Sequence, residues 1–272
     1  MYGFGLNTAG EPIVACSSNE DYSVYAHEKN VFEYYKNNIL SEKEKIVYDE
    51  IYESYLQFKP DLSTKVETLS ATELDRSFKA VYLDHPEIFW IKSYSPTLFG
   101  DKVITSKIIT LNYYYSEEQA KLLKAEVEKI YTPIINEANT FKTDEEKVKF
   151  VYDKLIEMGT YTNDENVDSG GYQSFISIFK SGKTVCTGFS YSFKFLMDNL
   201  GIESITISNL QESIEDSHVW NMVKLNNTWY NLDLTYDDKT NSQKGYTDYE
   251  YYLKDNEEFY KTHKMQSVVP EN

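Results

Sequence analysis

Cysteine and arginine are nearly absent from this chain. Among its 272 residues the only cysteines are Cys16 and Cys186, and the only arginine is Arg76. Two cysteines so far apart provide neither a disulfide framework nor the close ligand spacing of a metal site. The sequence therefore predicts no metal and no other cofactor, and each thiol must be interpreted from its own surroundings.

Basic residues are outnumbered by acidic ones, 27 to 44, and long apolar runs are missing. The formal net charge is −17 at pH 7, which repels the phosphates of nucleic acids and anionic membrane surfaces. No stretch approaches the roughly 18–20 apolar residues that cross a bilayer. We therefore expect neither a nucleic-acid partner nor a membrane span.

The first residues lack the pattern of an export signal. No apolar signal-peptide core follows Met1. The tetrapeptide IVAC, which ends at Cys16, looks like the cleavage box of a lipoprotein, but the preceding MYGFGLNTAGEP is too polar to act as its hydrophobic region. We therefore expect Cys16 to be an ordinary cysteine.

Aromatic side chains are what the sequence has in quantity, with 25 tyrosines and 14 phenylalanines. Hydrophobic residues make up 41% and charged residues 26%, as in ordinary globular proteins. A tyrosine packs with its ring while its hydroxyl still forms hydrogen bonds, which suits half-buried surfaces and clefts. The chain is long enough to bury a sizeable core as one large domain or two smaller ones.

Helix-start signals recur through the first half of the chain. In four places a serine or threonine is followed three residues later by Glu or Gln, the spacing of a capping box that satisfies free backbone amides. Pro133 lies within the third predicted helix and is expected to kink or split it. The boxes Ser41/Glu44, Ser70/Glu73, Ser116/Gln119 and Thr143/Glu146 predict helices at 42–58, 71–84, 117–139 and 144–158.

Strand signals lie between these helices and again near the end of the chain. Residues 87–94 and 102–115 are rich in β-branched and aromatic residues, which favours strands. In the last third a helix at 186–200 stops at Gly201, and strands are predicted at 202–208, 217–225 and 228–234.

This order of elements predicts an α+β fold. We expect an N-terminal segment at 1–40, an N-terminal α+β region at 41–142 and a C-terminal domain at 143–272. The composition changes after Gly159, where a polar, acidic stretch indicates a loop.

Part of that loop resembles the start of a calcium-binding loop. Asp164, Asn166 and Asp168 have the right spacing. Ser169, however, stands where glycine is required, and Phe175 stands where the bidentate glutamate belongs. We therefore interpret the stretch as a solvated loop near a cleft.

Cys186 begins the helix predicted at 186–200, directly after the residues GKTV. In the first turn of a helix, free amides and the positive end of the dipole favour a thiolate over a thiol. The same amides can bind a developing oxyanion. The alternative is a small, buried and inert cysteine, and this stretch alone favours neither interpretation.

A histidine and an aspartate follow in a predicted hairpin. Asn226-Asn227 is good turn chemistry because asparagine tolerates positive φ. A turn there places His218 opposite residue 235, with Asp233 two places away on the same face. A carboxylate beside a histidine stabilises the imidazolium, and an imidazole near a thiol can take its proton. The sequence thus predicts one site from Cys186, His218 and Asp233.

Three linked motifs resemble the transglutaminase-like superfamily of papain-fold thiol enzymes. They are GKTVCTGFSYSFKFLMDNLGI, HVWNMVKLNNTWYNLDLTYDD and a tyrosine-rich tail, YEYYLKDNEEFYKTH, and they lie within residues 141–263. Upstream, YLDHPEIFWI resembles the N-terminal extension of bacterial members. The resemblance implies a papain/transglutaminase-like core, in which the nucleophile helix packs on an antiparallel sheet, with a smaller N-terminal α+β region.

The resemblance also implies roles and a reaction. Cys186 matches the nucleophile, His218 the general base and acid, and Asp233 the orienting carboxylate. The thiolate would attack a glutamine amide of a protein or peptide substrate, so that a thioester forms on the cysteine and an amine or ammonia leaves. The thioester would then pass to a lysine or other amine, which crosslinks, or to water, which deamidates. Alternatives are a cysteine peptidase on the same scaffold and an inert surface or peptide-binding module.

Location follows from the same resemblance. Small, tyrosine-rich bacterial relatives with more lysine than arginine are often exported. We therefore expect an extracellular or cell-surface protein, with the cytoplasm as the alternative.

The oxyanion donors are predicted less directly than the triad. The backbone amide of Cys186 is one expected donor. A second is expected from the segment before it, where Gln173 and Tyr172 can both donate. Trp220 and Trp229 flank the hairpin; either could line an acyl-donor tunnel, although packing of the sheet is the expected role.

The remaining candidates are interpreted as structural. His85 and His263 are expected to serve the fold rather than the chemistry. Asp237 and Asp238 could form a surface acid pair, although a solvated turn is the expected arrangement.

Overall fold

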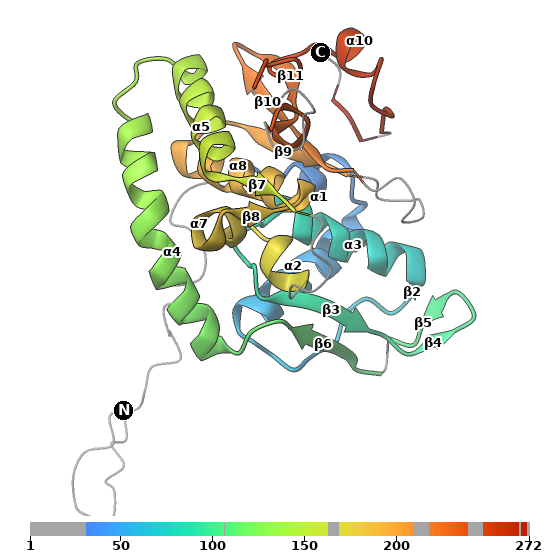
Figure 1. Cartoon of the computed structure of the whole chain (residues 1–272). Helices are drawn as coiled ribbons and strands as arrows, with labels where there is room; N and C mark the ends of the chain where they lie inside the picture. The colour runs from blue at the N-terminus through green and yellow to red at the C-terminus, as the bar shows by residue number, and fades with distance from the viewer. Residues whose placement is uncertain are drawn as a thin grey trace, which may run out of the picture.

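A computed structural model of the chain describes residues 31–105, 107–162, 169–208, 218–238, 247–266 and 268–270, with the backbone alone at 169 and 170. Helices and mostly antiparallel strands are mixed along the chain (Figure 1), so the predicted α+β class is confirmed. Cys16 and the calcium-like positions Asp164, Asn166 and Asp168 lie outside the described residues.

The helices begin where the sequence predicts. All four expected capping boxes are formed, each with the serine or threonine as the N-cap. The helices of the described residues are α1 (Tyr34–Asn38), α2 (Glu42–Leu56), α3 (Ala71–Asp84), α4 (Glu117–Ala138), α5 (Asp144–Met158), α6 (Ser169–Tyr172), α7 (Ile176–Ser181), α8 (Cys186–Leu200), α9 (Leu234–Asp237) and α10 (Asn256–Phe259).

Pro133 does not split α4, which continues through it to Ala138. A proline deprives the carbonyl four residues earlier, here that of Lys129, of its helical donor. Both Pro133 and Lys129 are exposed. Water can therefore satisfy that carbonyl, and the helix tolerates the loss.

The strands form several small sheets. The region expected as one strand at 102–115 is two strands in different sheets, because a turn in which Lys107 N donates to Ile104 O interrupts it. The sheet orders are β1-β6-β3, β2-β5-β4 and β11-β10-β9, with a parallel pair, β7-β8. The strands are β1 (Asp61–Leu62), β2 (Leu69–Ser70), β3 (Ile91–Ser95), β4 (Leu98–Phe99), β5 (Lys102–Val103), β6 (Ile109–Tyr113), β7 (Thr160–Tyr161), β8 (Lys183–Thr184), β9 (Ser204–Ile207), β10 (Trp220–Leu225) and β11 (Thr228–Leu232).

The hairpin of β10 and β11 has the predicted register. Asn226 and Asn227 form the turn with φ of 50° and 69°, and Asn221 pairs with Leu232. This register, continued outward, sets residue 218 opposite 235. β11 ends sooner than expected, because Asp233 caps the short helix α9 instead of extending the strand.

Helix α8 lies at the centre of the molecule. It packs against α4, α5 and α7 and against strands β9 and β10. It therefore lies between the β9–β11 sheet and these helices (Figure 1). One hydrophobic core joins residues from Tyr35 to Val268. It therefore extends on both sides of the boundary predicted at 142/143, and the domain division stays a prediction. No described helix combines the length and apolarity that a membrane crossing requires.

Candidate active site

The candidate nucleophile is the first residue of α8. Gly182 adopts φ of 71° at the end of α7, which turns the chain through β8 to Val185, the N-cap of α8. The first amides of a helix have no acceptor within it, so the Cys186 N–H has no partner in α8 and can meet an incoming oxygen. Cys186 is partly exposed.

Gly188 allows the preceding segment to lie directly against α8. A methyl group at this position would come within 1.9 Å of Thr184 Oγ1, 2.5 Å of Ser177 Oγ and 2.6 Å of Tyr172 O. Only glycine permits this approach. The chain before the helix is thereby held beside the turn that carries Cys186.

Two hydrogen bonds fix α8 to the strand that follows His218. Ser190 lies one turn after Cys186, and its Oγ donates to Val219 O at 3.1 Å. In return, the buried Asn221 donates from Nδ2 to Ser190 O at 3.1 Å. The helix and the strand are therefore locked together at the level of the thiol and the imidazole.

His218 contacts both other members of the predicted triad. Its Nε2 lies 2.5 Å from Asp233 Oδ2, and its side chain is also hydrogen-bonded to Cys186. Burial lowers the pKa of His218, but its hydrogen bonds to Asp233 and Cys186 and their charges outweigh burial and raise this pKa to about 10. At neutral pH the imidazolium form is therefore favoured.

Asp233 is held as a carboxylate from several sides. Its side chain is 1% exposed, and its Oδ1 accepts from the amides of Thr235 and Tyr236 at 2.8 and 3.1 Å. Burial raises the pKa of Asp233, but hydrogen bonds from His218 and His263 outweigh that effect and lower it. A fixed anion of this kind orients His218 and stabilises its charged form.

His263 also contacts Asp233, and the sequence did not predict this contact. Its Nε2 lies 2.9 Å from Asp233 Oδ2, the same oxygen that contacts His218. Its ring stacks on Phe259 at 3.9 Å, and its Nδ1 lies 3.0 Å from Thr262 Oγ1. A histidine 30 residues beyond Asp233 carries no spacing signal, since the fold of the tail alone brings it there.

Aromatic rings surround the thiol and the imidazole. His218 stacks on Tyr236 with ring centroids 4.7 Å apart, and Trp220 lies 6.1 Å from it on a nearly parallel plane. After the larger effect of burial, the charge of Cys186 raises the pKa of Tyr161, Tyr191 and Tyr236. Three phenols are therefore close enough to Cys186 to be affected by its charge.

The other sequence candidates fall in different places. Gln173 lines the same pocket as Thr187, the residue that follows Cys186. For Tyr172 the contact seen is a backbone one, in which its carbonyl accepts from Thr184 Oγ1 at 3.3 Å. Trp229 pairs with Lys224 near the hairpin turn and packs on Phe32, so it lies away from the histidine.

The expectation that Asp237 and Asp238 lie in a solvated turn is wrong, since both are fully buried. Asp237 accepts from Tyr152 Oη at 2.6 Å, and burial raises the pKa of Asp237 to about 6. The two carboxylates bind backbone and phenol groups beneath the site.

The donor atoms of His218, Asp233 and His263 lie within 4.8 Å of one another. Two imidazoles and a carboxylate could hold a zinc-type ion. The mutual hydrogen bonds already account for how these three side chains are placed.

A comparison with known families matches the part of the chain that carries these residues. Residues 134–234, which include Cys186, His218 and Asp233, match the family model of the transglutaminase-like superfamily. This part of the chain is similar to that superfamily. The papain/transglutaminase-like core, with its nucleophile helix on an antiparallel sheet, is thus confirmed.

Several solved structures are also similar to the chain. One is described as a TGase (TM-score 0.35, 15% identity, 53% of this chain and 44% of that chain). Another is a presumed cysteine protease from Cytophaga hutchinsonii (0.33, 14%, 47% and 50%). A third is the periplasmic domain of TgpA from Pseudomonas aeruginosa bound to ethylmercury (0.31, 11%, 47% and 55%). This chain spans less than two thirds of each of them, and no curated protein matches it.

Proposed function

We propose that this protein is a thiol enzyme that transfers the acyl group of a glutamine amide in a protein or peptide. The observation that carries the proposal is that one imidazole, His218, contacts a partly exposed thiol and a buried, fully bonded carboxylate. Cys186 is the nucleophile, His218 the base and acid, and Asp233 the residue that orients it.

In the first half-reaction the Cys186 thiolate attacks the carboxamide carbon of the substrate. The negative charge moves to the carbonyl oxygen, which the free Cys186 amide can stabilise. The carbon–nitrogen bond then breaks, and the imidazolium of His218 gives its proton to the leaving ammonia. A thioester remains on Cys186.

In the second half-reaction neutral His218 takes a proton from an amine or from water as either attacks the thioester. The carbon–sulfur bond breaks and the thiolate is restored. An amine gives an isopeptide bond, and water gives glutamate. The net charge of −17 attracts lysine-bearing acceptors, which favours the amine route.

A location at the cell surface is part of the proposal. It is tested by fractionating cells that express the full-length native gene and probing each fraction with an antibody against residues 31–272. Recovery in the cytoplasm alone would contradict it.

The activity is tested with a glutamine-containing protein and a fluorescent primary amine, while ammonia release and peptide fragments are followed in the same reaction. We expect amine incorporation and ammonia release that disappear in Cys186→Ala. Ammonia release without incorporation identifies deamidation. Cleaved peptide without amine incorporation or ammonia release identifies the peptidase alternative. If no product forms and Cys186 reacts with iodoacetamide no faster than an ordinary thiol, enzymatic function is contradicted.

A further inference from the structure

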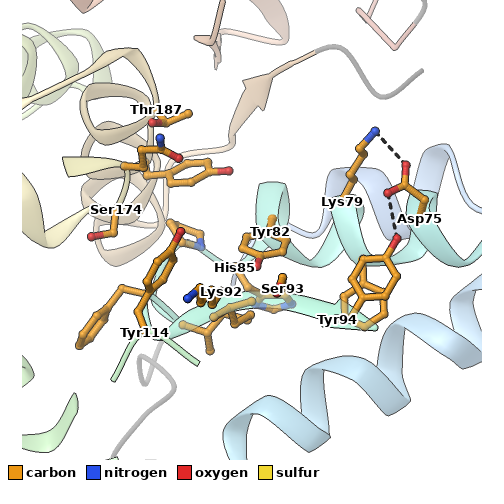
Figure 2. Close-up of a pocket in the computed structure, with 17 residues that line it drawn as sticks. Asp75, Lys79, Tyr82, His85, Lys92, Ser93, Tyr94, Tyr114, Ser174 and Thr187 are labelled. Carbon is orange, nitrogen blue, oxygen red and sulfur yellow. Dashed lines mark hydrogen bonds and ion pairs between the residues drawn. The ribbon is translucent and has the colours of Figure 1, made fainter. Parts of the chain in front are cut away.

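A pocket of about 370 Å³ lies between the N-terminal α+β region and the start of α8. Pockets of roughly this size take small ligands or single large side chains. One wall comes from α3, β3 and the end of β6, the other from the residues around α6, α7 and α8. In Figure 2, Tyr82, Lys92 and Tyr114 line one side, and Ser174 and Thr187 lie across from them.

The pocket begins next to the nucleophile. Thr187 follows Cys186 directly, and Tyr191 is on the next turn of the same helix. Gln173, the oxyanion candidate, lines the same wall. A substrate group held in the pocket therefore lies beside the first turns of α8, the helix that Cys186 begins.

The lining is apolar in its walls and carries polar groups without partners. Most of it is aromatic or aliphatic. Among the described residues no hydrogen-bond acceptor or donor meets the hydroxyls of Tyr82, Tyr114 or Tyr191, and Thr187 Oγ1 is buried without one. Rings with free hydroxyls suit a flat apolar group that carries acceptor atoms at its edge.

The pocket has one uncompensated charge. At its far end Asp75 is paired with Lys79 at 2.8 Å and accepts from Tyr94 Oη at 2.9 Å, as the dashed lines of Figure 2 show. Lys92 is exposed, lies over the ring of Tyr114 at 5.8 Å, and has no ion-pair partner within the described part of the chain. In a protein of net charge −17, such a lysine favours a ligand carboxylate.

We propose that this pocket is a substrate-recognition site that takes an aromatic side chain of the acyl-donor peptide, with an acidic neighbour of that residue paired to Lys92. The N-terminal region thereby selects which glutamine is used. The orientation of the peptide rests on the proposed function, whereas the pocket's preference for aromatic and acidic residues does not require turnover.

Binding to the Cys186→Ala chain tests the proposal without catalysis. The probes are two sets of four fluorescent heptapeptides with a central glutamine. In each set the residue adjacent to the glutamine is Phe or Ala, and the residue after that, further from the glutamine, is Asp or Asn. The varied residues lie on the amino side of the glutamine in one set and on the carboxyl side in the other. In one of the sets we expect Phe to bind about tenfold more tightly than Ala, and Asp about threefold more tightly than Asn.

Charge-reversed variants give the matched comparison. Lys92→Glu should abolish the Asp preference and keep the Phe preference, whereas Lys129→Glu, an exposed lysine on α4 away from the pocket, should change neither. Lys92→Met should give an intermediate result, and high salt should weaken the Asp preference only.

The outcomes separate the two proposals. Equal affinity for all four peptides in both sets, or equal effects of Lys92→Glu and Lys129→Glu, overturns the pocket proposal even if wild-type protein transfers acyl groups. Selective binding without turnover by the wild type supports the pocket and contradicts the proposed function.

Discussion

The described part of the molecule contains two histidine–carboxylate clusters that differ in what else they contact. His85 Nδ1 lies 2.8 Å from Glu87 Oε1 and its ring stacks on Tyr52, just as His218 contacts Asp233 and stacks on Tyr236. Charged and hydrogen-bonded neighbours outweigh burial in both, raising the pKa of His85 to about 9 and that of His218 to about 10.

Solvent exposure and a neighbouring thiol distinguish the two histidines. The His85 side chain is 2% exposed and that of His218 is 23% exposed, and only His218 also contacts a thiol. A paired histidine with a raised pKa is therefore not by itself a sign of catalysis. The nearby nucleophile and the opening to solvent make His218 the candidate.

The largest expected effect is the difference in reaction rate between variants of these two histidines. His218→Ala should lower the rate of acyl transfer by about a thousandfold, because general acid–base catalysis is lost. His85→Gln should leave kcat within a factor of two but lower the free energy of unfolding by about 3 kcal/mol, since a buried carboxylate loses its partner. Steady-state rates and urea unfolding measure the two effects. Equal rate losses in both variants would contradict the comparison.

Asp233→Asn tests the carboxylate behind the catalytic imidazole. It should lower kcat/KM by about a hundredfold, because the imidazolium loses its buried anion. Glu87→Gln, the matched change at the other cluster, should leave kcat/KM unchanged while it lowers stability. An Asp233→Asn protein with full activity would show that Asp233 serves only the fold.

The pH dependence should follow the raised pKa of His218. Because its imidazolium persists to about pH 10, kcat/KM should hold to about pH 9 and fall beyond it, and Asp233→Asn should move this fall to lower pH. A fall centred near 6.5, the usual histidine value, would contradict the account.

Stability should change with pH for the same reason. Both histidines have a higher pKa in the folded chain than the unfolded value of about 6.5. Their contribution is therefore complete below about pH 6.5 and is lost as the pH rises through about 9 and 10. The melting temperature should decline over this interval, and less so in His85→Gln.

The smallest expected effect is at His263, which we treat as a positioning residue because it acts through Asp233. His263→Phe should reduce kcat/KM about tenfold by removing one hydrogen bond to the carboxylate, and should shift the alkaline limb downward. His263→Gln can still donate to Asp233 and should restore part of both. A loss of melting temperature with an unchanged pH profile would make His263 purely structural.

Local signals predicted the site's framework well. The capping boxes fixed the starts of α2, α3, α4 and α5, and Cys186 was recognised as the start of α8. Asn226-Asn227 set the hairpin register that brings Asp233 beside His218. In each case the determining contacts lie within a few residues of the chain.

What the sequence did not reveal depends on distant contacts. His263 reaches Asp233 only through the packing of α10 and the tail. The burial of Asp237 requires Tyr152 from α5, and the pocket beside Cys186 requires two regions to meet. No periodicity or spacing records such contacts, because they join segments that are far apart in the chain.

The most direct test of the central claim is the rate at which iodoacetamide alkylates Cys186 at pH 6 in the wild type and in His218→Ala. Mass spectrometry of the peptide that contains Cys186 keeps Cys16 out of the signal. The account predicts at least tenfold faster alkylation in the wild type, because His218, which is hydrogen-bonded to Cys186, activates its sulfur as a nucleophile. Equal rates in the two proteins, both those of an ordinary cysteine, would contradict it.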